Sequence, residues 1–99
     1  MAQNIVFSGF SKVDADVKDM AEQKAQRFFE DSVRRKAQAQ ILRITLKVIH
    51  ERAKSEIYEL SGVLEEKGCR FAATASQRNL LLGMDELLRK LQRQYKSIS

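Results

Sequence analysis

The chain has 99 residues, enough for one domain with a buried core, and 43% of them are hydrophobic, an ordinary share for a globular protein. Lysine and arginine outnumber aspartate and glutamate by 18 to 13, and no apolar run is long enough for a transmembrane helix. The single cysteine excludes an intrachain disulfide, and residues 1–4 do not resemble the start of a secretory signal. We therefore expect a cytoplasmic protein with one domain over residues 1–99 and no contact with a membrane.

The first part of the sequence predicts a strand followed by a helix. Residues 4–9 are β-prone and end at Gly9, and Asp14 is placed to cap a helix that ends in the basic cluster Arg34, Arg35 and Lys36. The apolar positions recur with helical spacing, which predicts an inward face. Its expected members are Val17, Met20, Ala21, the stem of Lys24, Ala25 and Phe28.

From Ala39 the apolar period changes from helical to alternating, which predicts three antiparallel strands. Polar turns are expected at residues 50–54 and at Lys67–Gly68. The expected inward positions are Leu42, Ile44, Leu46 and Val48, then Tyr58, Leu60, Gly62 and Leu64, then Cys69, Phe71, Ala73 and Ala75.

A second helix is predicted after Ser76, which is a candidate cap, with an apolar stripe that runs from Leu80 to Tyr95. The resulting fold class is α+β with the order β-α-β-β-β-α. Because a helix connects the first two strands, these should be parallel, giving a four-stranded mixed sheet with both helices on one face. The α-β-β-β-α part has the same order as double-stranded RNA-binding domains.

Almost all of the excess positive charge lies in residues 68–99. This stretch contains six basic residues and only two acidic ones, Asp85 and Glu86. A one-sided basic surface is typical of a polyanion binder, although a solvated helix face with cations near its C-terminal end is the alternative. Lys90, Arg93 and Lys96 recur every three residues, so they could follow a nucleic-acid backbone together. The candidate RNA-binding residues are Arg89, Lys90, Arg93, Lys96, Lys24, Arg27, Arg34, Arg35, Lys36 and Arg78.

Three segments resemble the ribosome hibernation promoting factor and ribosome-associated inhibitor family. Residues 5–9 (IVFSG) are similar to its opening strand, and residues 13–28, with Lys24 and Arg27, are similar to its first helix. Residues 84–96 (MDELLRKLQRQYK) are the closest match and resemble its second helix. The sequence departs from the family at residues 74–79, where an acidic stretch is usual and Arg78 stands instead.

The resemblance is to the short form of the family, and it implies a partner rather than a substrate. Family members lie on the small ribosomal subunit, in the channel for mRNA and the A- and P-site tRNAs. They contact rRNA there, inhibit translation, and preserve idle ribosomes in starvation or stationary phase. This leaves open whether the chain promotes or prevents the formation of ribosome dimers.

The residues give no sign of catalysis. His50 and Cys69 are lone residues without metal-ligand or nucleophile–base spacing, and the four glycines form no phosphate-binding loop. We therefore expect no enzyme activity, no cofactor and no small-molecule substrate. Two other functions remain open: a double-stranded RNA-binding module of another purpose, and a protein-interaction or dimerisation domain that uses the free sheet face with Val63 and Ile49.

Overall fold

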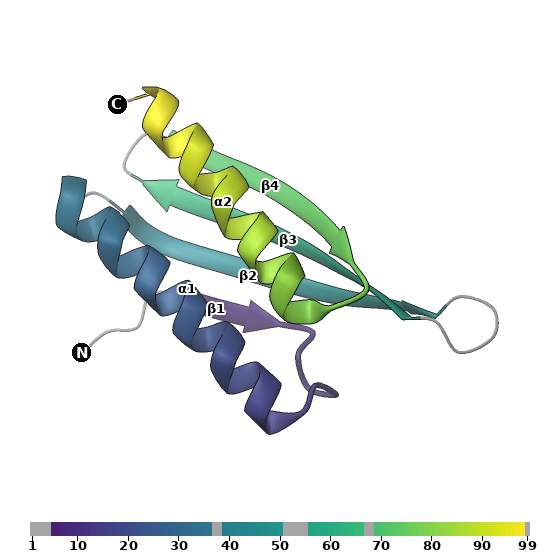
Figure 1. Ribbon diagram of the computed structural model, residues 1–99. Helices are drawn as coiled ribbons and strands as arrows, with labels where there is room; N and C mark the ends of the chain where they lie inside the picture. The colour runs from purple at the N-terminus through teal and green to yellow at the C-terminus, as the bar shows by residue number, and fades with distance from the viewer. Residues whose placement is uncertain (1–4, 37–38, 51–55, 67–68, 99) are drawn as a thin grey trace.

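The structure, a computed structural model, describes residues 5–36, 39–50, 56–66 and 69–98, without the side chains of residues 32–40, 50, 66, 69 and 95–98 (Figure 1). The elements follow the predicted order, which confirms the α+β fold class. They are β1 (Ile5–Ser8), α1 (Ala15–Lys36), β2 (Ala39–His50), β3 (Glu56–Glu66), β4 (Cys69–Gln77) and α2 (Leu80–Ile98).

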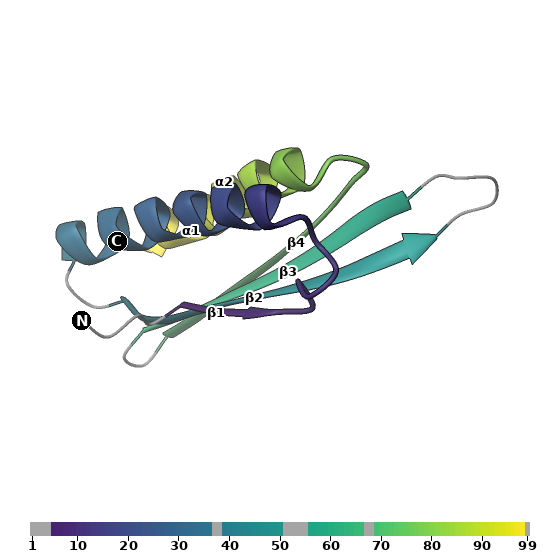
Figure 2. The same ribbon diagram turned by 90° about the horizontal axis from the view of Figure 1, so that it is seen from below.

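The four strands form one mixed sheet in the order β1-β2-β3-β4. The strands β1 and β2 are parallel, with Ile5 opposite Leu42, while β2–β3 and β3–β4 are antiparallel. Both helices lie on the same face of this sheet and leave the other face uncovered (Figure 2). The predicted layer arrangement is therefore confirmed, and we call the uncovered side the open sheet face.

The core lies between the sheet and the two helices, because each strand directs every second side chain toward the helix layer. Leu42, Ile44, Leu60 and Leu64 are fully buried from the sheet side. From α2 they are met by Met84, Leu87 and Leu91, which are fully buried as well.

Two glycines allow close backbone packing around this core. Gly62 lies in β3 beneath α2, where a Cβ atom would touch the side chains of Leu87 and Leu91. Gly9 follows β1 with a φ of +84°, and a Cβ atom there would collide with the backbone carbonyl of Leu46. The chain can therefore leave β1 along this path only because position 9 lacks a side chain.

Three sequence-based expectations need correction. Ser76 does not cap α2, because it lies in β4 opposite Glu59, and the cap is Asn79 instead. Met20 is not in the core, since 52% of its surface is exposed. His50 does not begin a turn but ends β2 opposite Glu56, while residues 51–54 and the predicted turn at 67–68 lie outside the described residues.

Candidate nucleic-acid interface

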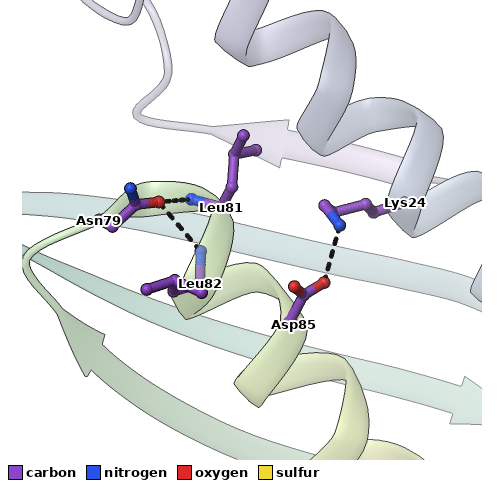
Figure 3. Close-up of polar contacts among 5 residues, drawn as sticks. All are labelled: Lys24, Asn79, Leu81, Leu82 and Asp85. Carbon is purple, nitrogen blue, oxygen red and sulfur yellow. Dashed lines mark hydrogen bonds and ion pairs between the residues drawn. The ribbon is translucent and has the colours of Figure 1, made fainter.

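The two helices lie side by side on the sheet and run in the same direction (Figure 1). The start of α2 is fixed by Asn79, whose side-chain oxygen accepts hydrogen bonds from the backbone amides of Leu81 (2.9 Å) and Leu82 (3.1 Å) (Figure 3). These two amides are among the donors that a helix cannot satisfy internally. The cap therefore sets where each basic residue of α2 stands relative to α1.

A groove of about 660 Å³ runs between the helices on the side away from the sheet, and we call it the helix groove. Apolar side chains, among them Phe28 and Leu88, line it together with polar and charged groups from both helices. Its full lining is Met20, Gln23, Lys24, Arg27, Phe28, Asp31, Leu81, Asp85, Leu88, Arg89 and Gln92. The helix groove thus brings together Lys24 and Arg27 of α1 with Arg89 of α2, although α1 and α2 lie at opposite ends of the sequence.

An ion pair crosses the helix groove. The Lys24 ammonium lies 2.9 Å from the Asp85 carboxylate, and both side chains are partly exposed (Figure 3). An exposed pair of this kind stabilises a fold by only about 0–1 kcal/mol. Its larger consequence is that Lys24, a predicted RNA-binding residue, already has an acidic partner.

Arg27 and Arg89 line the groove from opposite helices, about one turn beyond this ion pair. Both are exposed, and in the part of the chain that the structure describes no ion pair is recorded for either. Two guanidinium groups on facing helices form a site that favours an anion, because each carries several donors arranged to fit phosphate oxygens. Asp31 is the remaining acid of the groove.

The basic residues of α2 differ in how they are engaged. Lys90 lies 3.1 Å from Glu86 and donates a hydrogen bond of 2.8 Å to the backbone carbonyl of Thr74. Arg93 is exposed beside Arg89, in a shallow hollow on the other flank of α2. The predicted series Lys90, Arg93 and Lys96 is therefore not uniform: Lys90 is held by the protein itself, and the side chain of Lys96 lies outside the described residues.

Glu86 holds Lys90 in place and is itself held by β4. The side-chain amide of Gln77 donates a hydrogen bond of 2.7 Å to the Glu86 carboxylate. The pKa of Glu86 lies below its ordinary value, chiefly because of this hydrogen bond and then because of the one from Lys90, with the charges of Lys90 and Arg89 acting in the same direction. Glu86 therefore stays ionised and keeps its hold on Lys90.

The other predicted residues lie at the ends of the helix layer. Arg34, Arg35 and Lys36 form the last turn of α1, but their side chains lie outside the described residues. Arg78 is exposed between β4 and α2, at the opposite end of the layer, where both helices begin (Figure 1). The structure does not bring Arg78 together with Arg93.

Several groove residues were not predicted as site residues from the sequence. Gln23 and Gln92 add amide groups to the groove, and Met20 contributes an exposed apolar side chain. An exposed methionine within a helical apolar period is indistinguishable from a core residue until the neighbouring helix is placed. No pattern within either helix alone indicates which residues of α1 and α2 lie opposite each other.

The open sheet face is close to electrically balanced. Lys47 stands opposite Glu59 in the register of β2 and β3, and Arg70 lies 3.9 Å from Glu65. Val63 and Ile49 are only partly exposed on this face, and Arg43 stands opposite Val63. On this face Lys47 and Arg70 therefore each have a glutamate opposite them, while Arg43 does not.

Other kinds of site find little support in the described part of the chain. Within those ranges no three side chains of the metal-ligating types lie together. None of the helices there has the length and apolar character needed to cross a membrane.

No model of a known protein family matches this sequence, and no curated protein sequence matches it either. Solved structures of other proteins match its fold over nearly the whole chain, among them the following two. One is a ribosomal subunit interface protein from Coxiella burnetii, with a TM-score of 0.69, 17% identity, and coverage of 96% of this chain and 99% of that one. The other is the Protein Y N-terminal domain of Thermus thermophilus, with a TM-score of 0.61, 15% identity and full coverage of both chains. The chain therefore shares its fold with these two structures, in agreement with the β-α-β-β-β-α order predicted from the sequence.

Proposed function

We propose that this protein binds the small ribosomal subunit in the channel for mRNA and tRNA and keeps idle ribosomes inactive. The observation that carries the proposal is the set of three arginines, Arg27, Arg89 and Arg93, exposed on the helix layer without a recorded ion pair among the described residues. The family resemblance of α1 and α2 supports it, and so does the fold shared with a ribosomal subunit interface protein.

Ribosomal RNA suits this surface for two reasons. Its phosphates are densely spaced, and proteins recognise its folded helices mostly by shape. Each arginine that neutralises a phosphate releases condensed counterions, which favours binding at low salt. A-form RNA hides the base edges of its major groove, so a rigid protein surface contacts phosphates, 2′-hydroxyls and splayed bases instead. The helix groove offers charged and apolar contacts, since Arg27 and Arg89 line it together with Met20 and Phe28.

The proposed mechanism is occupancy rather than chemistry. A protein placed in the decoding channel excludes mRNA and tRNA by volume, so it needs no cofactor and no substrate. In this proposal the protein acts in the cytoplasm, and its partners are the small subunit and rRNA. Arg34, Arg35, Lys36 and Lys96 extend the contact at the C-terminal ends of the helices, and Arg78 extends it at the opposite end.

Cosedimentation with purified small subunits across a salt series tests the proposal. We expect the protein to pellet with vacant subunits at low salt and to be released steeply as salt rises, with a log–log slope of roughly one unit per phosphate contact. Adding mRNA and initiator tRNA first should reduce the pelleted protein. Protein that stays in the supernatant with subunits at low salt would contradict the proposal.

A long RNA duplex as competitor separates this function from a general double-stranded RNA-binding module. The ribosomal proposal expects duplex RNA to compete weakly even in molar excess. Equal affinity for the duplex and for the subunit would instead identify a duplex-binding module, which the shared α-β-β-β-α order allows.

A further inference from the structure

The strand β4 forms one edge of the sheet, pairing only with β3 among the described strands. The carbonyls of Ala72 and Thr74 on this strand accept hydrogen bonds from α2 side chains. These carbonyls therefore point outward, and in an antiparallel strand the N–H of the same residue points the same way. Ala72 and Thr74, with Arg70 and Ser76 in the same phase, thus form the outer edge of the sheet.

Two side chains from successive turns of α2 cover this edge. The Lys90 ammonium lies 2.8 Å from the carbonyl oxygen of Thr74, and the Gln94 amide lies 2.6 Å from that of Ala72. Four residues of helix rise by about 6 Å and two residues of strand by about 6.7 Å, so this spacing matches two donors to two alternate carbonyls. Lys90 and Gln94 therefore lie over the two neighbouring outward-facing residues Thr74 and Ala72.

The cover is anchored at its other end. Glu86, one turn before Lys90, pairs with it at 3.1 Å and accepts a hydrogen bond from Gln77 at the end of β4. Three consecutive turns of α2, at Glu86, Lys90 and Gln94, are therefore fastened along β4. Lys90 is fixed by two partners although nearly half of its side chain is exposed.

We propose that Lys90 and Gln94 close the β4 edge against strand pairing, and that the surface beneath them is a latent site for β4 of a second copy of this chain. An uncovered edge strand is a template for addition of another strand, and lysine at the edge is a common protection against it. β4 is nine residues long, and of its outward residues Ala72, Thr74 and Ser76 are small and uncharged, while Arg70 is the charged one.

A second copy fits this edge better than an unrelated segment does, because the edge is complementary to itself. An antiparallel two-fold arrangement centred on Ala73 sets Ala72 opposite Thr74 and Arg70 opposite Ser76, so no like charges meet. Since α2 packs over both β3 and β4, the two copies of α2 would lie about 10 Å apart, which is within the range of packed helices. The inference does not depend on ribosome binding.

The oligomeric state of the double variant Lys90→Met/Gln94→Met tests the inference, because methionine keeps the apolar stem and the helix propensity but removes both donors. We expect the unmodified protein to sediment as a monomer of 11.4 kDa at about 100 μM and the variant to sediment at twice that mass. The Ala72 and Thr74 amides should exchange with solvent at least tenfold more slowly in the variant dimer. The matched control, Arg89→Met/Arg93→Met, removes two α2 cations that have no recorded bond to β4 and should remain a monomer.

A proline substitution in the outer edge of β4 tests whether the two copies pair through this strand. Adding Thr74→Pro to the double variant should restore the monomer, because proline removes an outward N–H without removing a bond to β3. If the double variant fails to fold, as circular dichroism would show, the single variants Lys90→Met and Gln94→Met are each expected to dimerise more weakly. A folded variant that stays monomeric, or a dimer that the proline leaves intact, would overturn the inference. No RNA is present in this experiment, so its failure would leave the ribosomal proposal untouched.

Discussion

The helix layer and the open sheet face both carry basic residues, but they differ in which of these are neutralised. On the open sheet face, Lys47 and Arg70 each have a glutamate beside them, and Arg43 stands opposite Val63. In the helix layer Lys24 and Lys90 are paired with acids, whereas no ion pair is recorded among the described residues for Lys18 or for Arg27, Arg89 and Arg93.

In the proposed interface, pairing rather than the number of charges decides which cations are available to a polyanion. A cation already neutralised within the protein releases few counterions when a phosphate arrives, so it adds little to binding. In the helix layer the paired lysines hold α2 to α1 and to β4, and the arginines remain for a partner. The predictions below test this division, starting with the largest expected effect.

The helix layer depends on the core beneath α2. Leu87 is fully buried, so Leu87→Ala should lower the free energy of unfolding by about 3 kcal/mol through lost burial and a cavity. Chemical denaturation followed by circular dichroism measures the loss. Leu82→Ala on the same helix, where 57% of the side chain is exposed, is the control and should cost less than about 0.5 kcal/mol. Equal effects of the two substitutions would contradict the packing described for α2.

The unpaired arginines should dominate binding. Replacing Arg27, Arg89 and Arg93 with alanine is expected to weaken binding to the small subunit about 100-fold, or roughly 2.7 kcal/mol, and to reduce the salt slope by roughly 3 units. The matched control removes the same number of cations from the open sheet face, Arg43, Lys47 and Arg70, and should change affinity less than about threefold. Cosedimentation or fluorescence anisotropy measures both variants. Equal losses would mean that net charge alone governs binding.

The cap of α2 should contribute to stability and not directly to binding. Asn79→Ala removes the acceptor for two amides and should cost about 1 kcal/mol of unfolding free energy. Ser76→Ala alters the residue that the sequence suggested as the cap and should change stability by less than about 0.3 kcal/mol. Thermal unfolding of the two variants compares them directly, and a larger loss in the Ser76 variant would reverse the assignment.

The smallest effect is expected at the ion pair across the helix groove. Asp85→Asn frees Lys24 to meet a phosphate, so affinity for the small subunit should rise about threefold at low salt, while stability falls by less than 1 kcal/mol. The control, Glu59→Gln, removes an acid opposite Lys47 on the open sheet face and should leave affinity unchanged. Tighter binding by both variants would show that affinity depends on net charge and not on where the acid is removed.

The sequence predicted the fold well because the apolar period reports the local structure directly. Alternation at Leu42, Ile44 and Leu46 and the helical spacing of Met84, Leu87 and Leu91 each reflect a single element that buries one face. The wrong prediction of the α2 cap arose because two nearby residues could each cap the helix. Ser76 and Asn79 both cap helices well, and only the length of β4 decides between them.

The candidate site was less predictable because it depends on contacts between elements. Glu86 and Lys90 are four residues apart, so their ion pair could be predicted from the sequence of α2 alone. The bond from Lys90 to Thr74 and the pair formed by Lys24 with Asp85 are not, since both require the position of α2 relative to β4 and α1. The basic residues of α2 therefore appear equivalent in the sequence, although Lys90 is bound to Glu86 and Thr74 while Arg93 is exposed.

The shared direction of α1 and α2 has a consequence for how a polyanion would approach. Helix dipoles that point the same way add, so the layer carries partial positive charge at the end where both helices begin and partial negative charge at the other. Asp16 offsets this charge in the first turn of α1, whereas the first turn of α2 has no acid. The partial positive charge is therefore offset less at the start of α2 than at the start of α1, so a phosphate is favoured more at the first turn of α2.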